Sequence, residues 1–587
     1  MKQYILRLVA CFSILIMVSS CNDSFLDRFP ETSITEEVFF ATPADLKTYT
    51  NGMYGYITSS YWDIGTDNSL YVEEPSIYKI MRGEISAKNA GKWSWSTIRN
   101  VNFMLARTGK TSGEASEINH YIGLARLFRA KLYYDKVKTY SDVPWYSRDL
   151  KTTNQELLYK PQDTRALVVD SIMADLEYAV NNMKSGSGRS RLYKEAALAL
   201  QARIALHEGT FRKYHSELGL NDSDRFLNIA VKACETLINS GTFSLTPNYL
   251  SLFRSLDLSK NPEIIFYEDY DMALERRHNA ASMFGWTHGL SRDLMEDYLY
   301  IDNGESKPFT QVPGYDKVGV TEFHKNRDPR LAMTFWTPGY MRVNGVKPYV
   351  PNLGQGGYPQ IKFEPQTTDQ LTWNMAYTDL PVIRYAEVLL IYAEAKAELG
   401  ILTQIDIDKS VNKIRERAGI PTAKLTDWEA NIDPAQVDKY PNVTSSQKAA
   451  ILEIRRERRV ELAAEGFRLD DLNRWASGKL LEKAPEGIYI DKLGYHDLNG
   501  DGDPDIAIVE TAADVAAIPE EDKTKYSLVI YKLEGHSIEL TNKTSGYVRL
   551  VSQVNKFKFE EPKYYYYPLD EQDLLINENL FQNKFWK

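Results

Sequence analysis

The sequence predicts a mostly helical protein whose helices form hairpins, with a long irregular, loop-rich region and a small β-containing insertion near the C-terminus. Apolar side chains recur at helical spacing in several stretches, at residues 118–138, 164–183, 194–208, 226–239 and 379–399. Residues 242–378 are rich in Pro, Gly and aromatic residues and carry few helical signals. Short β-type runs follow near the C-terminus, at residues 488–490, 506–509 and 528–531.

The chain begins with the features of an export signal. Lys2 and Arg7 supply positive charge, and residues 8–18 form an apolar run too short to span a bilayer. Residues 18–21 then read Val-Ser-Ser-Cys, which resembles a lipoprotein cleavage box with Cys21 as the lipidated residue. We expect a lipid anchor without a transmembrane helix. The alternative is ordinary secretory cleavage beside a chance cysteine.

Motifs for catalysis are missing from the sequence. It has three cysteines, too few for a disulfide framework or a cysteine zinc site, and eight scattered histidines. It contains no G-x-S-x-G elbow, no H-E-x-x-H motif and no phosphate-binding Gly loop. A pair of glycosidase carboxylates stays open, because two such groups need only meet in space. The net charge of −10 comes without a basic patch of the kind that binds nucleic acid. The sequence therefore shows none of these catalytic motifs, which by itself is weak evidence against an enzyme.

The individual helices have recognisable ends. Residues 35–56 predict a first helix with a break at Pro43. The helix at 118–138 ends in a proline-limited turn at 140–144. The helix at 379–399 begins with Asp379 and has Pro381 near its start, and residues 405–418 predict its mate.

Residues 450–475 combine an apolar stripe with a dense run of charge. Ile451, Ile454, Leu462 and Leu469 fall near one face, while residues 455–459 are all charged and circle the helix. Arg458 and Glu465 therefore fall on the apolar stripe and need buried partners. The candidate partners lie in the helix at 379–399 and are Arg384, Glu387, Glu394 and Glu398. The alternative is a solvated helix with surface pairs such as Glu453 with Arg456.

The same stretch resembles the C-terminal signature of the SusD/RagB family of Bacteroidetes outer-membrane lipoproteins. The matching residues are Ile454, Arg455, Glu457, Arg458, Glu461, Leu462, Glu465, Gly466, Phe467, Arg468, Asp471, Arg474 and Trp475. Residues 126–144 and 567–583 resemble further elements of the family, although Ser141, Leu569, Asp570 and Glu578 depart from its patterns. The resemblance implies tetratricopeptide-type helical hairpins, a location on the outer membrane and a SusC-like TonB-dependent transporter as partner. Together with the missing catalytic motifs, it also implies a non-enzyme without a catalytic cofactor.

The resemblance also suggests a domain plan. A signal peptide at 1–20 precedes one SusD-like domain at 21–587. Within that domain we expect a helical scaffold at 30–240 and 379–476, and a ligand region at 242–378. We expect the insertion at about 480–560 and the family tail at 564–587.

Aromatic residues are abundant, with 38 Tyr, 22 Phe and 10 Trp, which favours a binding surface. Trp93 and Trp95 alternate with small residues directly before a helix, so one core stripe explains both rings poorly. Trp62, Arg82 and Trp286 lie in other irregular stretches and can converge on this pair. The predicted glycan-binding residues are Trp62, Arg82, Trp93, Trp95, Trp286, Trp336 and Trp373. For each tryptophan, burial in the core is the alternative.

The leading hypothesis is a cell-surface lipoprotein that binds a polysaccharide or oligosaccharide and delivers it to the SusC-like transporter. Flat aromatic rings suit sugar C–H groups, and nearby polar side chains suit hydroxyls. Two other classes stay open at this point, a helical-repeat peptide receptor or scaffold and a secreted hydrolase.

Residues 497–505 contain an Asp-rich loop between two predicted strands. Oxygen side chains at Asp497, Asn499, Asp501 and Asp505, with Gly502 between them, follow the start of an EF-hand-type calcium loop. Ile508 stands where that loop requires Glu, which excludes a full EF-hand. We expect a structural Ca²⁺ on these four residues, and a solvated Asp-Gly turn is the alternative.

Overall fold

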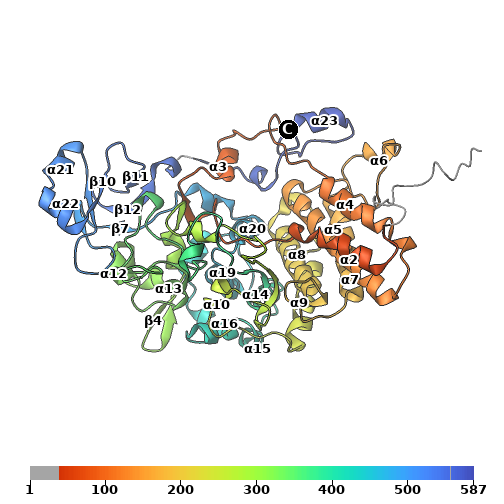
Figure 1. Cartoon of the computed structure of the whole chain (residues 1–587), viewed down its shortest axis with the longest axis horizontal. Helices are drawn as coiled ribbons and strands as arrows, with labels where there is room; N and C mark the ends of the chain where they lie inside the picture. Colours follow the sequence, from red (N-terminus) through yellow and green to blue (C-terminus); the bar gives the residue numbers. More distant parts are fainter. Residues whose placement is uncertain (1–38, 555–556) are drawn as a thin grey trace, which may run out of the picture.

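The computed structural model of the protein describes residues 39–554 and 557–587. Cys21 and the predicted signal peptide lie outside these residues. Among the residues described, no helix is both long and apolar enough to cross a bilayer. Figure 1 shows an elongated molecule, with stacked helices in its right half and a region of loops and short strands in its left half.

The right half is the predicted scaffold of helical hairpins. Helix α5 packs against α7, α7 against α8, and α8 against α9 (Figure 1). The bounds of these helices and of those beside them are α2 (Pro43–Asn51), α4 (Ser96–Leu105), α5 (Ala115–Tyr140), α6 (Gln155–Leu158), α7 (Arg165–Asn182), α8 (Lys194–Tyr214) and α9 (Ser223–Asn239). Helix α2 begins at Pro43, where a break was predicted, because Thr42 and Asp45 form a capping box.

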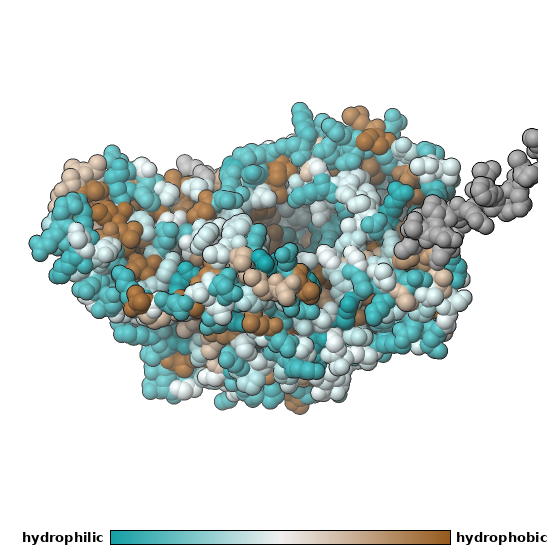
Figure 2. All heavy atoms as spheres, viewed as in Figure 1, coloured by the Kyte–Doolittle hydropathy of each residue, from teal (hydrophilic) through white to brown (hydrophobic). Residues whose placement is uncertain are grey.

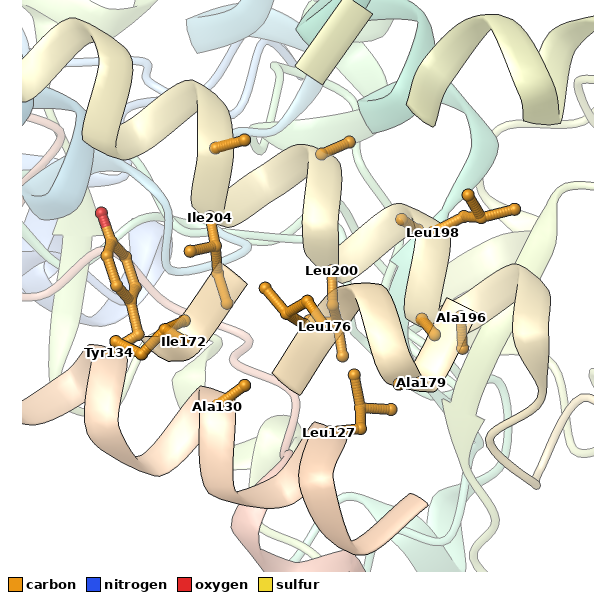
Figure 3. Close-up of a cluster of buried hydrophobic side chains, with 14 of the residues drawn as sticks. Leu127, Ala130, Tyr134, Ile172, Leu176, Ala179, Ala196, Leu198, Leu200 and Ile204 are labelled. Atoms are coloured by element: carbon orange, nitrogen blue, oxygen red, sulfur yellow. The ribbon is translucent and has the colours of Figure 1, made fainter. Parts of the chain in front are cut away.

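The core of this scaffold is made by residues one helical turn apart on facing helices. Leu127 and Ala130 of α5, Leu176 and Ala179 of α7, and Leu200 of α8 point into one cluster (Figure 3). Each of these side chains is at most 2% exposed. Burial of a leucine side chain contributes about 1.5–3 kcal/mol, while the alanines let the helices approach closely.

The centre of the molecule holds the second set of helices. Their bounds are α14 (Tyr385–Glu398), α15 (Gln404–Lys409), α16 (Val411–Ala418), α17 (Leu425–Ala430), α18 (Pro434–Lys439), α19 (Lys448–Glu461) and α20 (Arg468–Arg474). The prediction of one helix over residues 379–399 is wrong at its start. Residues Leu380–Arg384 form strand β6, which pairs with β2 (Ile264–Glu268), so the Asp-Leu-Pro sequence opens a strand and not a helix.

Helix α19 is buried on every side. All five charged residues at 455–459 are at most 4% exposed, so the interpretation as a solvated helix is wrong. Arg458 finds its partner inside the same stretch, 2.9 Å from Asp471. The predicted single helix breaks after Glu461, and Ala464 and Gly466 have φ angles of 61° and 79° there.

The break carries Glu465 away from the apolar stripe and toward β6. Its carboxylate lies 2.7 Å from Arg384 and 2.7 Å from Lys362. Two further predicted partners also join this network, because Glu394 binds Arg474 at 2.5 Å and Glu398 lies 3.4 Å from Arg455.

Of the four predicted partners, Glu387 does not bind a residue of the 450–475 stretch. Glu387 binds Arg203 of α8 at 2.6 Å, because it faces the neighbouring hairpin rather than α19.

A short segment near the N-terminus completes the network. Asp67 is 8% exposed and binds Arg459 at 3.0 Å and Arg468 at 2.6 Å. The buried carboxylate of Asp63 accepts hydrogen bonds from the backbone N–H groups of Ala464 and Gly466, at 2.7 and 3.0 Å. Residues 63–68 are therefore held by a part of the chain about 400 residues away.

The loop-rich region at 242–378 contains only short elements in the described residues. They are α10 (Ser251–Arg254), β2, β3 (His288–Leu290), α11 (Arg292–Glu296), β4 (Tyr300–Asp302), β5 (Glu305–Lys307), α12 (Val320–Phe323) and α13 (Arg330–Thr334). Strand β3 pairs with β1 (Ser69–Tyr71), and β4 pairs with β5.

The predicted β insertion forms two three-stranded sheets at the left end of Figure 1. One sheet has the order β10-β9-β8 and the other the order β11-β12-β7. The bounds are β7 (Tyr489–Ile490), β8 (Gly494–His496), β9 (Ile506–Val509), β10 (Val529–Lys532), β11 (Ile538–Leu540), β12 (Gly546–Leu550), α21 (Ala512–Ala517) and α22 (Glu520–Tyr526).

The insertion shares a hydrophobic core with the loop-rich region. Ile488 and Val548 belong to the same buried cluster as Leu290 and Tyr358. At Gly487 the two backbones meet so closely that an added Cβ would lie 1.8 Å from the carbonyl oxygen of Gly356. Only glycine permits this contact.

The C-terminal tail returns to the helical half of the molecule. The N–H of Tyr567 donates to the carbonyl of Thr139 at 2.7 Å, and the tail then forms helix α23 (Glu571–Ile576). Helix α3 (Ser76–Met81) lies near the same upper edge in Figure 1. The 3₁₀ helices are η2 (Tyr54–Tyr56), η3 (Thr108–Lys110), η4 (Ser216–Leu218), η5 (Ala280–Met283), η6 (Phe309–Gln311), η7 (Tyr315–Lys317), η8 (Leu353–Gln355), η9 (Thr368–Gln370), η10 (Gly478–Glu482), η11 (Val551–Gln553) and η12 (Lys563–Tyr565).

Candidate functional site

Trp93 and Trp95 line a pocket of about 430 Å³ that lies among α4, α6 and α23. We call this pocket the tryptophan pocket. These three elements lie together at the upper right of Figure 1. Its lining residues are Trp93, Trp95, Ile98, Arg99, Asn102, Pro144, Tyr146, Arg148, Leu150, Leu158, Tyr159, Asp573, Ile576, Asn577 and Leu580.

The two indoles stand nearly at right angles to each other. Their ring centroids are 5.1 Å apart and their planes meet at 84°. Trp93 also contacts Tyr140 edge-on at 4.9 Å, and Trp95 contacts Tyr146 edge-on at 5.5 Å. Contacts to several neighbours fix both rings in orientation, which makes them a rigid surface for a ligand.

The local sequence explains why the two rings lie together. The chain turns at Gly91 and Lys92, whose φ angles are 60° and 67°, and α4 begins directly after Trp95. The N–H of Gly91 donates to the Asp570 carboxylate at 3.1 Å, which ties this turn to the C-terminal tail.

A lysine ammonium lies beside the aromatic rings. Nζ of Lys136 is 5.5 Å from the ring centre of Trp95, 6.0 Å from that of Trp93 and 5.6 Å from that of Tyr140. It donates a hydrogen bond of 2.9 Å to the carbonyl of Lys92. Burial lowers the pKa of Lys136 to about 8. The ammonium is held there by this hydrogen bond and by cation–π attraction, and among the described residues it forms no ion pair with a carboxylate.

Polar groups line the rest of the pocket. Asn102 is buried and serves the structure, because its amide donates to the carbonyl of Tyr146 at 2.7 Å and accepts from Arg129 at 2.9 Å. Arg99 and Arg148 are exposed, and Asp573 reaches the pocket from α23. Burial and the neighbouring Asp570 raise the pKa of Asp573, while Lys136 lowers it.

The rim of the pocket is apolar and open to solvent. Leu158 and Tyr159 of the α6 segment are 37% and 41% exposed, and Ile576 of α23 is 68% exposed. Figure 2 shows hydrophobic atoms at the upper edge of the molecule, over α23. A pocket that combines fixed aromatic rings, an apolar rim and a few polar side chains is typical of small-molecule and carbohydrate sites.

The other predicted glycan-binding residues do not line the tryptophan pocket. Trp62, Trp286 and Trp373 are 38%, 51% and 56% exposed and belong to other surfaces. Arg82 is paired with Glu74 and with Glu84, the latter at 2.5 Å. The expected convergence of Trp62, Arg82 and Trp286 on the pair of indoles is therefore wrong.

Trp336 is not part of any surface. Its ring is wholly buried in the core shared with the β insertion, and its indole N–H donates to the carbonyl of Tyr349 at 3.0 Å. The prediction that Trp336 binds glycan is wrong, because a ligand cannot reach a ring in this position without opening that core.

The sequence analysis missed several residues of the tryptophan pocket. Tyr146, Tyr159, Arg99 and Arg148 follow Trp95 within about 65 residues, but no local pattern connects them. One signal was present, since Tyr146 lies two residues after Pro144, the last residue of the proline-limited turn that ends the α5 stretch.

The Asp-rich loop holds its predicted calcium ligands close together, but they bind one another and the backbone. Asn499 donates to Asp505 at 2.8 Å and to Asp501 at 3.1 Å. Both carboxylate oxygens of Asp497 accept from glycine N–H groups, at 2.7 and 2.9 Å. Across residues 39–554 and 557–587, no group of three or more His, Cys, Asp or Glu side chains is arranged to hold a metal ion. Calcium binding stays a prediction.

Known proteins resemble this chain in sequence. The SusD-like protein P38 of Formosa agariphila is 24% identical over 495 residues, which cover 79% of this chain and 90% of that protein. A SusD-like protein of Bacteroides ovatus is 24% identical over 262 residues, which cover 42% of this chain and 47% of that protein.

Solved structures show the same fold. A SusD-like carbohydrate-binding protein from Bacteroides fragilis superposes with a TM-score of 0.65 at 21% identity, covering 92% of this chain and 100% of that one. A laminarin-binding SusD-like protein superposes with a TM-score of 0.54 at 18% identity, covering 92% of this chain and 98% of that one.

The family assignment rests on the sequence itself. The model of the SusD family matches residues 262–586, more than half of the chain, and this range includes the signature at 450–475 and the family tail. The chain belongs to the SusD family.

Proposed function

We propose that this protein binds a polysaccharide or oligosaccharide in the tryptophan pocket at the cell surface and delivers it to a SusC-like TonB-dependent transporter. The family consists of non-catalytic binding proteins, which supports binding rather than turnover. Two of the structures with this fold are named for carbohydrate and laminarin binding.

The single observation that carries the proposal is the pair of fixed indoles in an open pocket. Trp93 and Trp95 are both partly exposed, and both are held by edge-on contacts to tyrosines. Sugar rings present C–H groups that pack on such faces, while the exposed side chains of Arg99 and Arg148 can bind hydroxyl groups.

The test is binding of purified protein to a panel of polysaccharides, by retention in polysaccharide gels and by calorimetry. For the glycans that bind, Trp95→Ala should weaken affinity at least about tenfold, as is usual for aromatic hot spots. Trp286→Ala is the matched control, because Trp286 is an exposed tryptophan outside the pocket.

Trp95 also packs on Tyr133 and Tyr146, so thermal melts must accompany the binding data. Trp95→Phe keeps an aromatic face and should recover part of the lost affinity. If Trp286→Ala loses binding and Trp95→Ala keeps full binding, the glycan site lies in the loop-rich half of the molecule and not in the tryptophan pocket. Binding to peptides and to no glycan would favour a peptide receptor instead.

Delivery to a transporter is tested separately. Tagged protein purified from its native membranes in mild detergent should bring along a TonB-dependent transporter in a fixed ratio. If the purified protein carries no such transporter, the delivery step is wrong and only the binding function stands.

A further inference from the structure

Two arginines in the tryptophan pocket have no ionic partner within the described part of the chain. Arg99 projects from α4 and Arg148 from the loop that follows α5, and both are exposed. Neither forms an ion pair among residues 39–554 and 557–587. The contrast with Arg129 of the neighbouring helix is sharp, because Arg129 binds Asp175 through two hydrogen bonds of 2.7 and 2.8 Å.

The pocket therefore carries an excess of positive charge. Among its lining residues in the described chain, Asp573 is the one carboxylate beside two guanidinium groups.

This local charge opposes that of the whole molecule. The chain has a net charge of −10, so a polyanion gains no general attraction to its surface. An anionic ligand that binds must find a local positive site, and the tryptophan pocket supplies one beside two aromatic rings.

We infer that the tryptophan pocket selects glycans that carry an anionic group, either the carboxylate of a uronic acid or a sulfate ester, over neutral glycans. A guanidinium presents a planar fork of N–H donors that binds carboxylate or sulfate oxygens in pairs. The sugar ring packs on Trp93 or Trp95 while its anionic group binds Arg99 or Arg148. This inference rests on the proposed function and names the substrate class of the same site.

The experiment compares polymers that share a backbone and differ in charge. De-esterified polygalacturonan is compared with its highly methyl-esterified form, and dextran sulfate with dextran, within the wider polysaccharide panel. The first pair reports on uronate and the second on sulfate. We expect the binding set to consist of acidic polymers and binding to disappear when the carboxylates are esterified or the sulfates are absent.

Substitution of the arginines assigns the effect to the pocket. Arg99→Gln and Arg148→Gln should each weaken acidic-glycan binding about fivefold to tenfold, the range for losing an ionic hydrogen bond in a partly exposed site. Lys347→Gln removes an exposed cation that does not line the pocket, and it should change nothing. Wild-type affinity should also fall as salt is raised from 0.05 to 0.5 M, about a threefold change in Debye length.

The outcomes separate this inference from the proposed function. Binding to neutral glycans alone, lost in Trp95→Ala and kept in Arg148→Gln, overturns the inference and leaves the proposed function standing. Acidic-glycan binding that survives both arginine substitutions also overturns it. No binding to any glycan in the panel overturns both.

Discussion

Replacement of Arg384 by methionine should strongly destabilise the protein. Arg384 is 2% exposed and lies 2.9 Å from Glu263, 2.6 Å from Glu461 and 2.7 Å from Glu465. It also donates to the carbonyl of Glu461 at 2.8 Å. Removing the guanidinium leaves three buried carboxylates with fewer cations, and breaking a buried pair costs about 3–5 kcal/mol.

The assay is urea unfolding at pH 7, followed by tryptophan fluorescence, with the free energy of unfolding extrapolated to water. Lys325→Met is the control, since Lys325 and its partner Glu322 have side chains 59% and 63% exposed. It should change the free energy of unfolding by less than about 0.5 kcal/mol.

A double substitution tests whether the cost arises from the unpaired charge. Arg384→Met with Glu465→Leu should lose less stability than the sum of the two single variants, by about 2 kcal/mol. A loss below 1 kcal/mol in Arg384→Met, or strict additivity in the double variant, would refute the electrostatic explanation.

Three further predictions concern pH, calcium and the anchor. Burial lowers the pKa of His278 to about 4, and its two ring nitrogens already bind the Thr378 carbonyl and the Ala280 N–H, so protonation favours the unfolded chain. This stabilisation is complete above the unfolded pKa of about 6.5 and is lost as pH falls toward 4. The difference in unfolding free energy between the wild type and His278→Gln should therefore shrink from pH 7 to pH 6 and pH 5, and a constant difference would contradict this. Calcium should raise the melting temperature of metal-free protein, and Asp501→Ala should abolish this rise. Equal melting temperatures in calcium and in chelator would mean that the loop is a solvated turn without bound calcium. Cys21→Ala should release the protein from membranes, and a variant that still labels with fatty acid excludes lipidation at this residue.

The scaffold was predictable from the sequence because its signals are local. Helices α5, α7 and α9 end within about three residues of their predicted bounds, since apolar spacing and turn residues lie next to each other along the chain. Strand β6 was mistaken for the start of a helix, because Pro381 is compatible with a helix start and its strand partner lies more than 110 residues away.

The binding pocket was predictable only in part. Trp93 and Trp95 stood out because they alternate with small residues before a helix. Their partners on α6 and α23 come from segments about 60 and 480 residues away, which no local pattern connects. Trp336 could not be told from an exposed tryptophan, since burial there depends on packing against the β insertion.

The charge network joins residues that lie far apart in the sequence, which constrains the order in which parts of the chain can fold. Asp67 cannot be neutralised until Arg459 and Arg468 exist, so a nascent chain must carry this carboxylate unpaired through most of its synthesis. The arginines of α19 pair with carboxylates as far away along the chain as Asp67 and Glu398. Such distant pairings raise the conformational entropy that the chain must lose before these contacts form. Docking of residues 63–68 onto α19 and α20 should therefore be a late and slow step.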